Sequence, residues 1–178
     1  NERAVNGDDF LTSGADNLNR FKGQGEITMY RIMVVDDEDY ILKALNRVLA
    51  TRPDWEVETY TDAATALRRA RTTVFDAVIT DYRMPDMDGI EMLQELRTMQ
   101  PDTIRILLTG VIDIDTLMSA INQAGAFRFV PKPWDDDQLL ESVEEGLKFR
   151  DILVENKILA QTVRDQREAL RSMGYDGE

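Results

Sequence analysis

Short apolar runs of strand type alternate with amphipathic runs of helix type through the middle of the chain. The strand-type runs are rich in Val, Ile and Leu, and the helix-type runs repeat apolar residues at helical spacing. This alternation predicts a parallel sheet, because each helix is the crossover that returns the chain to the same edge of the sheet. The five strands are expected at residues 30–36, 55–60, 75–81, 104–110 and 127–130.

Five helices are expected between and after these strands, and Asp62 is the expected N-cap of the second. A parallel sheet buries both faces, so the helices are expected on both sides of it. The sequence therefore predicts an α/β fold with a five-stranded parallel sheet. The helices are expected at residues 38–51, 62–71, 89–99, 113–124 and from 135 onward.

The chain divides into three parts by composition and pattern. Residues 1–28 are rich in Gly, Asn and Asp without a sustained apolar period, so they are expected to be a disordered tail or linker. Residues 29–146 carry the alternating pattern and are the expected domain. Residues 147–178 begin with a long charged helical pattern and are expected to be a C-terminal helical extension.

The composition removes several kinds of site. The chain has 178 residues with neither Cys nor His, which excludes disulfides, thiolate metal sites and histidine chemistry. Any metal is therefore expected to be a hard cation bound by oxygen atoms. The net charge of −13 argues against direct binding of nucleic acid by this chain.

The sequence also indicates where the protein works. Its apolar runs are shorter than the roughly 20 residues that a membrane span needs. The N-terminal residues lack the basic and then apolar layout of a signal peptide. With the absence of Cys, these features predict a cytoplasmic protein that does not bind a membrane.

Polar residues follow the expected strands at the points where the strands end. Asp36 and Asp37 follow the first strand, Asp81 ends the third, Thr109 ends the fourth, and Lys132 follows the fifth. In an open parallel sheet, binding sites lie outside the carboxyl ends of the strands. These five side chains are therefore expected along one edge of the sheet.

Side chains of these types suit phosphoryl transfer. Two neighbouring carboxylates repel each other unless a cation lies between them, and Mg²⁺ favours a few carboxylates with waters and phosphate oxygens. A third acid beside the cation, here Asp81, can attack phosphorus, while Thr109 and Lys132 can hold the phosphoryl oxygens. Each residue alone also fits an ordinary role, such as a helix-terminal acid or a turn former.

The motifs that carry these residues resemble the receiver domain of two-component response regulators. The resemblance covers about residues 30–146, roughly two-thirds of the chain, and implies a flavodoxin-like fold and a phosphorylation-dependent signalling switch. The matching motifs are VVDDE at 34–38, DAVITDYRMPDMDG at 76–89, LLTG at 107–110 and AFRFVPKPW at 126–134.

This resemblance implies a metal site and a phosphoacceptor. Asp81 is expected to accept the phosphoryl group from the phospho-His of a partner sensor histidine kinase. Mg²⁺ is the implied cofactor, with Asp36, Asp37, Asp81 and the backbone carbonyl of Arg83 as its ligands.

The same resemblance implies a switch around the phosphoryl group. Thr109 and Lys132 are expected to contact the phosphoryl oxygens, and the peptide bond between Lys132 and Pro133 is expected to be cis. Phe129 matches the aromatic residue of the switch, which would turn inward when Thr109 moves toward the phosphoryl group.

Two other functions share part of this pattern. A haloacid-dehalogenase-like phosphohydrolase also uses an aspartyl nucleophile, but it has a second Asp two residues later, where this chain has Arg83. A degenerate receiver would serve only as a docking scaffold, but the complete set of acceptor, acids, Thr and Lys argues against that reading. The domain is accordingly expected to be a switch that helps to catalyse its own modification and not an enzyme with a released product.

The C-terminal extension carries an apolar stripe at alternating spacings of three and four residues. This spacing predicts a parallel two-stranded coiled coil, and hence a homodimer, with Asn at one a position. A lone amphipathic helix folded back on its own domain is the alternative. The positions are Phe149, Asn156, Val163 and Leu170 at a, and Ile152, Leu159, Gln166 and Met173 at d.

The output of the switch is less readable from the sequence. The segment INQAGAFRFVPKPW resembles regulators that carry cyclic-dinucleotide phosphodiesterase domains and hydrogenase-type transcription activators. Helices of this kind often connect a receiver to an effector, so an effector outside this chain is expected.

Overall fold

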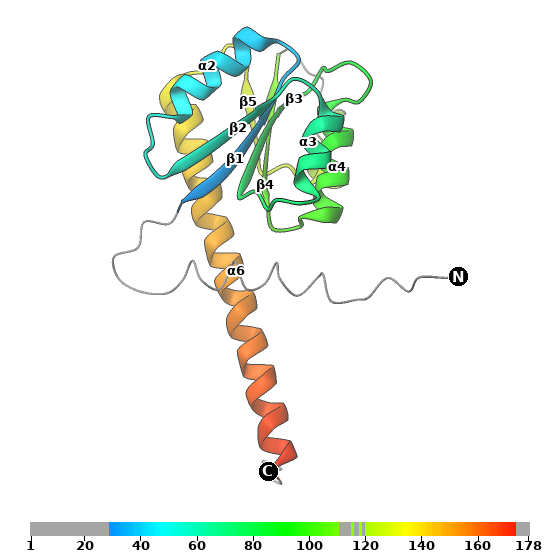
Figure 1. Cartoon of the computed structure of the whole chain (residues 1–178), viewed down its shortest axis with the longest axis vertical. Coiled ribbons are helices and arrows are strands. Elements are labelled where there is room, and N and C mark those ends of the chain that lie inside the picture. The colour runs from blue at the N-terminus through cyan, green and yellow to red at the C-terminus, as the bar shows by residue number, and fades with distance from the viewer. Residues whose placement is uncertain (1–28, 111–114, 116–117, 119, 174–178) are drawn as a thin grey trace, which may run out of the picture.

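The protein forms one parallel sheet flanked by helices, with a long helix leaving one end (Figure 1). The computed structural model describes residues 29–110, 115, 118 and 120–173, so the expected tail at 1–28 lies outside the described residues. The sheet has the order β2-β1-β3-β4-β5, and every neighbouring pair is parallel, as predicted. The strands are β1 (Tyr30–Val35), β2 (Trp55–Tyr60), β3 (Ala77–Asp81), β4 (Ile104–Thr109) and β5 (Arg128–Pro131).

The helices fall where the sequence predicts them, with one difference. The expected helix at 113–124 is described mainly at its end, where the backbone forms a π turn and not an α turn. Arg97 donates hydrogen bonds to the carbonyls of Asn122 and Gln123, and these contacts accommodate the wider turn. The helices are α2 (Asp39–Leu49), α3 (Ala63–Ala70), α4 (Gly89–Met99), η2 (Ala120–Ala124) and α6 (Asp136–Ser172).

Two hydrophobic layers hold the helices on the sheet. Side chains alternate along each strand, so Ile32 and Ile79 face α2 and α6, whereas Met33 and Val78 face α3 and α4. Figure 1 shows α2 and α6 on one side of the sheet and α3 and α4 on the other. The central strand β3 is buried along its whole length, and this rigid strand carries Asp81 at its end.

Acidic residues fix the starts of three helices. The side chain of Asp62 accepts a hydrogen bond from the backbone N–H of Thr65, which confirms the predicted N-cap of α3. Asp88 forms a capping box with Glu91 at the start of α4. Asp135 caps α6 through a hydrogen bond that its side chain accepts from the backbone. Several acidic residues of this sequence are therefore N-caps of helices and are not candidates for the chemistry of a site.

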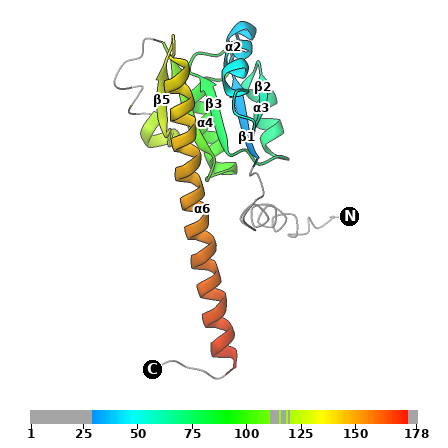
Figure 2. The same cartoon turned by 90° about the vertical axis from the view of Figure 1, so that its left-hand side faces the viewer.

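Helix α6 is one continuous element that crosses the predicted boundary at 146/147 without a break. It begins at the carboxyl edge of the sheet, lies along it, and runs past the amino edge (Figures 1 and 2). Gly146 lets it pack closely, because a Cβ there would lie 2.6 Å from Cγ2 of Ile104. Of the helices that the structure describes, none has the length and apolar character to span a membrane.

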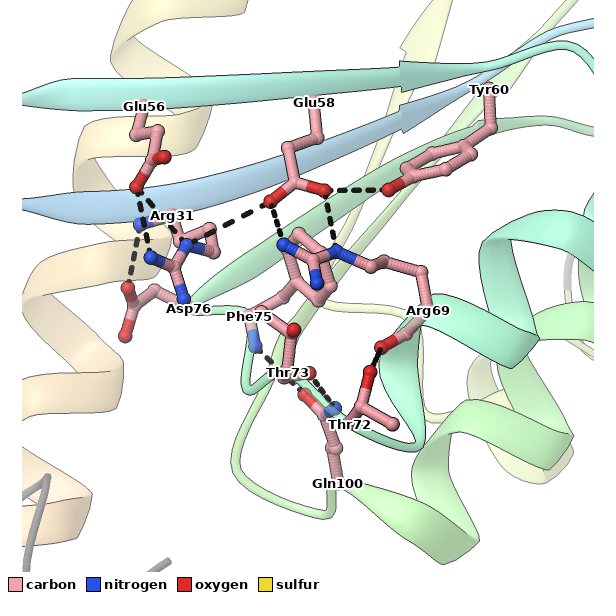
Figure 3. Close-up of polar contacts among 10 residues, drawn as sticks. All are labelled: Arg31, Glu56, Glu58, Tyr60, Arg69, Thr72, Thr73, Phe75, Asp76 and Gln100. Carbon is pink, nitrogen blue, oxygen red and sulfur yellow. Dashed lines mark hydrogen bonds and ion pairs between the residues drawn. The ribbon is translucent and has the colours of Figure 1, made fainter.

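A buried amide fixes the approach to β3. The Oε1 atom of Gln100 accepts a hydrogen bond from the backbone N–H of Phe75 at 2.9 Å, and its Nε2 atom donates to the carbonyl of Thr73 (Figure 3). The same Nε2 atom donates to the carbonyl of Ala70. Three backbone groups of the turn before β3 are satisfied by one side chain. This helps to set the position of β3 and therefore of Asp81 at its far end.

Candidate phosphoacceptor site

Asp81 ends β3 at the carboxyl edge of the sheet and is buried. Helix α4 begins directly against it, since a Cβ on Gly89 would lie 2.1 Å from the carbonyl oxygen of Asp81. The backbone N–H of Gly89 donates a hydrogen bond to the carbonyl of Tyr82 at 2.9 Å. Only a residue without a side chain fits this approach, so Gly89 holds the loop after β3 tightly against the site.

Lys132 joins the acids of two strands. Its Nζ atom lies 2.6 Å from Oδ2 of Asp36 and 2.7 Å from Oδ1 of Asp81. The backbone N–H of Lys132 donates to the carbonyl of Thr109 at 2.7 Å, so the loop after β5 is tied to the end of β4. The peptide bond between Lys132 and Pro133 is cis, as the sequence led us to expect.

The two acids after β1 differ in environment. Asp36 is fully buried, and its Oδ1 atom accepts a hydrogen bond from the backbone N–H of Glu38 at 2.9 Å. Its own backbone N–H donates to the carbonyl of Tyr60 at the end of β2. Asp37 is exposed at the same edge. One acid is thus fixed by the fold, whereas the other faces solvent.

Burial and charge oppose each other in the Asp36–Lys132 pair. Burial raises the pKa of Asp36 above its usual value, although the hydrogen bonds from Lys132 and Glu38 act in the opposite direction. Burial favours the neutral amine of Lys132, but its hydrogen bonds to Asp36 and Asp81 prevail and raise its pKa. Lys132 is therefore the cation of this site, shared by two carboxylates that compete for it.

The two residues expected to form the switch lie on neighbouring strands, β4 and the edge strand β5. Thr109 is buried at the end of β4, and its hydroxyl lies 3.4 Å from the carbonyl oxygen of Gly110. Phe129 pairs with Leu107 across the β4–β5 register and is partly buried against the core on the α3 and α4 side. The structure therefore places Thr109 at the site edge and Phe129 behind it.

Comparison with known proteins identifies the family. The model of the response regulator receiver domain matches residues 32–144, which is more than half of the chain. The chain belongs to the response regulator receiver family. This membership is consistent with a phosphorylation-dependent switch, and the motifs that indicate it in the sequence all lie within the matched range or at its edge.

Two curated relatives show the same relationship. The chain is 35% identical over 118 residues to the hydrogenase transcriptional regulatory protein HoxA of Bradyrhizobium diazoefficiens, covering 66% of this chain and 24% of HoxA. It is 35% identical over 133 residues to the regulatory protein AtoC of Escherichia coli, covering 75% of this chain and 28% of AtoC. The chain therefore spans only about a quarter of the length of these relatives.

Solved structures agree with the receiver fold. An adenylate cyclase from Rhodopirellula baltica aligns with a TM-score of 0.70 and 32% identity, over 75% of this chain and 98% of that one. The signal receiver domain of an HD domain-containing protein from Pseudomonas fluorescens Pf-5 aligns with a TM-score of 0.66 and 33% identity, over 69% of this chain and 98% of that one. Receiver domains of one fold are thus found in proteins of different kinds.

The acidic side chains at the carboxyl edge of the sheet suit a divalent cation in type and charge, although they do not form a compact cluster. Within the described ranges, no group of three or more acidic side chains is close enough to hold a metal. Two carboxylates, Asp36 and Asp81, share the ammonium group of Lys132, and the exposed Asp37 adds a third acid at the same edge, so one positive charge stands against three negative ones (−3 + 1). A donor set made of oxygen atoms with this charge matches the preference of Mg²⁺.

The structure adds features that the sequence analysis missed. Beside the site lies a cavity of about 490 Å³, to which Lys132 contributes one wall. Tyr40, on the first turn of α2, is largely exposed at this cavity. The indication of this cavity in the sequence was weak, since a single aromatic residue on a helix, such as Tyr40, forms no specific pattern. The other lining residues are Glu38, Ile41, Pro133 and Trp134.

Proposed function

We propose that this receiver is a signalling switch in which Asp81 accepts a phosphoryl group from the phospho-His of a sensor histidine kinase. The observation that carries the proposal is the Lys132 ammonium, bonded to both Asp36 and Asp81 at the carboxyl edge of the sheet. A nucleophilic carboxylate held beside a cation is the arrangement that transfer to an aspartate requires.

The transfer is a displacement at phosphorus. A carboxylate oxygen of Asp81 attacks, the P–N bond to the imidazole breaks, and the electron pair stays with the imidazole nitrogen. The residues that would hold Mg²⁺ are Asp36, Asp37, Asp81 and the backbone carbonyl of Arg83. When bound, Mg²⁺ supplies neutralisation of charge on the phosphoryl oxygens.

Lys132 and Thr109 act on the product. The Lys132 ammonium, already 2.7 Å from Asp81, is placed to bind a phosphoryl oxygen. The Thr109 hydroxyl lies 3.4 Å from the carbonyl oxygen of Gly110, a long contact for a hydroxyl donor, and among the described residues this weak bond does little to oppose its movement toward the new anion. Phe129 would then turn into the space that Thr109 leaves.

The output is proposed to pass through α6. The a and d positions that the sequence predicts are all exposed along α6, and from Ile152 onward they are available to pair with a second copy, whereas the ring of Phe149 stacks on Phe127 with centroids 5.6 Å apart. A cytoplasmic homodimer is proposed, with no direct nucleic-acid binding by this chain and any effector activity outside it. The exposed seam residues are Phe149, Ile152, Asn156, Leu159, Val163, Gln166, Leu170 and Met173.

Phosphorylation by a small-molecule phosphodonor tests the proposal. The protein is incubated with acetyl phosphate and Mg²⁺, and the covalent adduct is measured by intact mass and by its lability to hydroxylamine. Wild type should form a stable acyl phosphate, and Asp81→Asn should form none while its circular dichroism stays unchanged. The matched control is Asp86→Asn, which alters an exposed acid of the same loop and should label like wild type.

Three outcomes separate the functions that share these residues. A stoichiometric adduct lost in Asp81→Asn supports the switch. Release of phosphate over many turnovers without an accumulated adduct would instead identify a phosphohydrolase. Absence of any adduct, or an unchanged adduct in Asp81→Asn, would contradict the assignment of Asp81 as acceptor.

A further inference from the structure

A buried ion pair connects α6 to the edge of the sheet opposite the phosphoacceptor. The Nη2 atom of Arg150 lies 3.0 Å from Oδ1 of Asp76, and both side chains are almost fully buried. Asp76 directly precedes β3, whereas Asp81 ends it, so the pair and the acceptor lie at the two ends of one strand. At about 3.3 Å per residue, they are separated by about 17 Å.

Further contacts extend this pair into a joint. The Oδ2 atom of Asp76 accepts a hydrogen bond from the backbone N–H of Arg31 at 2.7 Å (Figure 3). The hydroxyl of Tyr30 donates to Oδ2 of Asp151, the residue after Arg150, at 2.6 Å. Two consecutive residues of α6 are therefore bonded to β1 and to the start of β3. We call Tyr30, Asp76, Arg150 and Asp151 the basal joint.

The basal joint differs from the other ion pairs of α6. The Arg52–Glu144 and Arg128–Glu145 pairs are substantially exposed, as surface pairs usually are, and pairs of that kind contribute little to stability. Arg150 is instead buried, and within the described residues its Nε atom has no hydrogen-bond partner. A buried pair with an unsatisfied donor is not optimised for stability, which favours a role in fixing geometry.

The basal joint lies where α6 leaves the domain. Val154, one turn after Arg150, is the last buried residue of the helix, and Lys157 still forms an ion pair with Asp102. Nearly all of the helix after this point is exposed. A contact at the exit point of a helix has the greatest effect on the direction and rotation of its free part, so the joint is well placed to orient the exposed end of α6.

The rotation set by this joint turns the apolar seam away from the receiver from Ile152 onward, whereas Phe149 at its start stacks on Phe127. An α-helix advances by about 100° per residue, so Ile152 lies about 200° from Arg150, and Leu159 lies about two and a half turns from it. The exposures agree, at 3% for Arg150 against 57% for Ile152 and 56% for Leu159. The side of α6 that packs on the sheet and the side that carries the seam are therefore opposite.

The residues beside the seam fit a second copy of the same helix. In a parallel pair, each g position faces the following e position of the partner helix. Glu155 would face Ala160, and Thr162 would face Arg167, so like charges do not oppose each other at these positions. Small uncharged residues at Ala160 and Thr162 also let a second helix approach closely.

We propose that the basal joint makes α6 and the receiver one rigid body whose seam points outward. A second copy would then dock along the outer face of α6, and the two receivers would lie on opposite outer sides of the paired helices. Arg150 is the positioning residue of this arrangement. The proposal rests on the proposed homodimer and adds how the two receivers are placed in it.

Spin-label distances test this placement in the full chain. The chain has no Cys, so Thr72→Cys and Glu168→Cys each introduce a single labelling site. Thr72 is exposed after α3, on the face of the sheet opposite α6, and Glu168 is exposed on the free part of α6. We expect a short distance between the two Glu168 labels and a long, narrow distribution between the two Thr72 labels.

Variants of the joint provide the decisive comparison. Arg150→Met should broaden the Thr72 distribution at least twofold, while the Glu168 distance stays unchanged because the seam is intact. If Arg150→Met alone fails to fold, the double variant Asp76→Asn/Arg150→Met replaces it, because it leaves neither charge of the pair without its partner. The double variant should broaden the Thr72 distribution by the same amount. The matched control is Arg128→Met, which removes an exposed ion pair of α6 and should leave both distributions as in wild type.

Several results would overturn the proposal. A short Thr72 distance in wild type would mean that the receivers contact each other, and a distribution still narrow in both joint variants would mean that Arg150 does not orient the helix. Loss of the Glu168 distance in wild type would instead show that the homodimer itself is absent. The two labelling sites therefore distinguish failure of this proposal from failure of the dimer on which it rests.

Discussion

The Nζ atom of Lys132 lies 2.7 Å from Oδ1 of Asp81 although the two residues come from strands that are not neighbours. The ammonium reaches from the end of β5 across β4 to the end of β3, and also to Asp36 after β1. The site is therefore assembled by the sheet order and not by any local segment, and its properties depend on this one cation.

Replacement of Lys132 should destabilise the fold and increase the effect of Mg²⁺. Lys132→Met leaves the carboxylates of Asp36 and Asp81 unpaired, and a lost charged partner of this kind lowers the free energy of unfolding by about 1–3 kcal/mol. Added Mg²⁺ should restore part of the loss. Urea unfolding with and without Mg²⁺ measures both effects, and exposed Lys148→Met is the control. Equal stability of Lys132→Met and wild type would show that the bridge is energetically unimportant.

Mg²⁺ should stabilise wild type through its binding to the acids after β1. At about ten times its dissociation constant, a ligand of the folded state raises the free energy of unfolding by about 1.4 kcal/mol. Asp37→Ala should remove most of this gain, whereas Asp39→Ala alters an exposed acid paired with Lys43 and should retain it. Thermal unfolding across a Mg²⁺ titration gives the comparison. The same gain in Asp37→Ala and wild type would remove Asp37 from the ligand set.

Much of this site was predictable from the sequence because it follows from periodicity. Strand ends can be located from apolar runs, and parallel strands bring their carboxyl ends to one edge, which places Asp36, Asp81 and Lys132 together. The direct contacts of Lys132 with both acids confirm that these three meet. The π turn at Ala120–Ala124 was not predictable, because it is accommodated by Arg97 from another helix.

Replacement of Gly89 should disturb the proposed acceptor, Asp81, through its backbone. A Cβ at this position would lie 2.1 Å from the carbonyl oxygen of Asp81, so the start of α4 must shift. We expect Gly89→Ala to lower the free energy of unfolding by about 1–3 kcal/mol, as overpacking does, and to slow phosphorylation of Asp81. The matched control is Gly110→Ala at the same edge, where a Cβ meets nothing within 4 Å. If both variants behave like wild type, the close approach is not structurally important.

The basal joint shows a second limit of sequence reasoning. Asp76 lies within an apolar strand run and Arg150 within a long charged helix, and nothing in either local pattern connects them. Their pairing depends on the rotation of α6 against the sheet, which the close approach of Gly146 to Ile104 also helps to fix. One feature of the sequence did indicate that Asp76 has a partner. Burying a charge is costly, so a charged residue in an otherwise apolar strand run requires an oppositely charged or hydrogen-bonding partner from elsewhere in the fold.

Charged substitutions in the seam should separate association from phosphorylation. Ile152→Glu/Leu159→Glu places two negative charges on the exposed apolar face of α6, where a second helix would bury them, so we expect a monomer in sedimentation equilibrium. Both residues lie opposite the buried side of the helix, so the receiver core should be unaffected. Acetyl phosphate should therefore still label Asp81 to the wild-type extent.

The control for this experiment carries the same added charge away from the seam. Gln161→Glu/Ser172→Glu alters two exposed positions of α6 outside the a and d set and should remain a dimer like wild type. A seam variant that stays dimeric would place the interface elsewhere, with the receiver surface as the next region to test. A seam variant that loses labelling together with association would show that the helix and the acceptor site are not separable, because Asp81 would then depend on the paired state of α6.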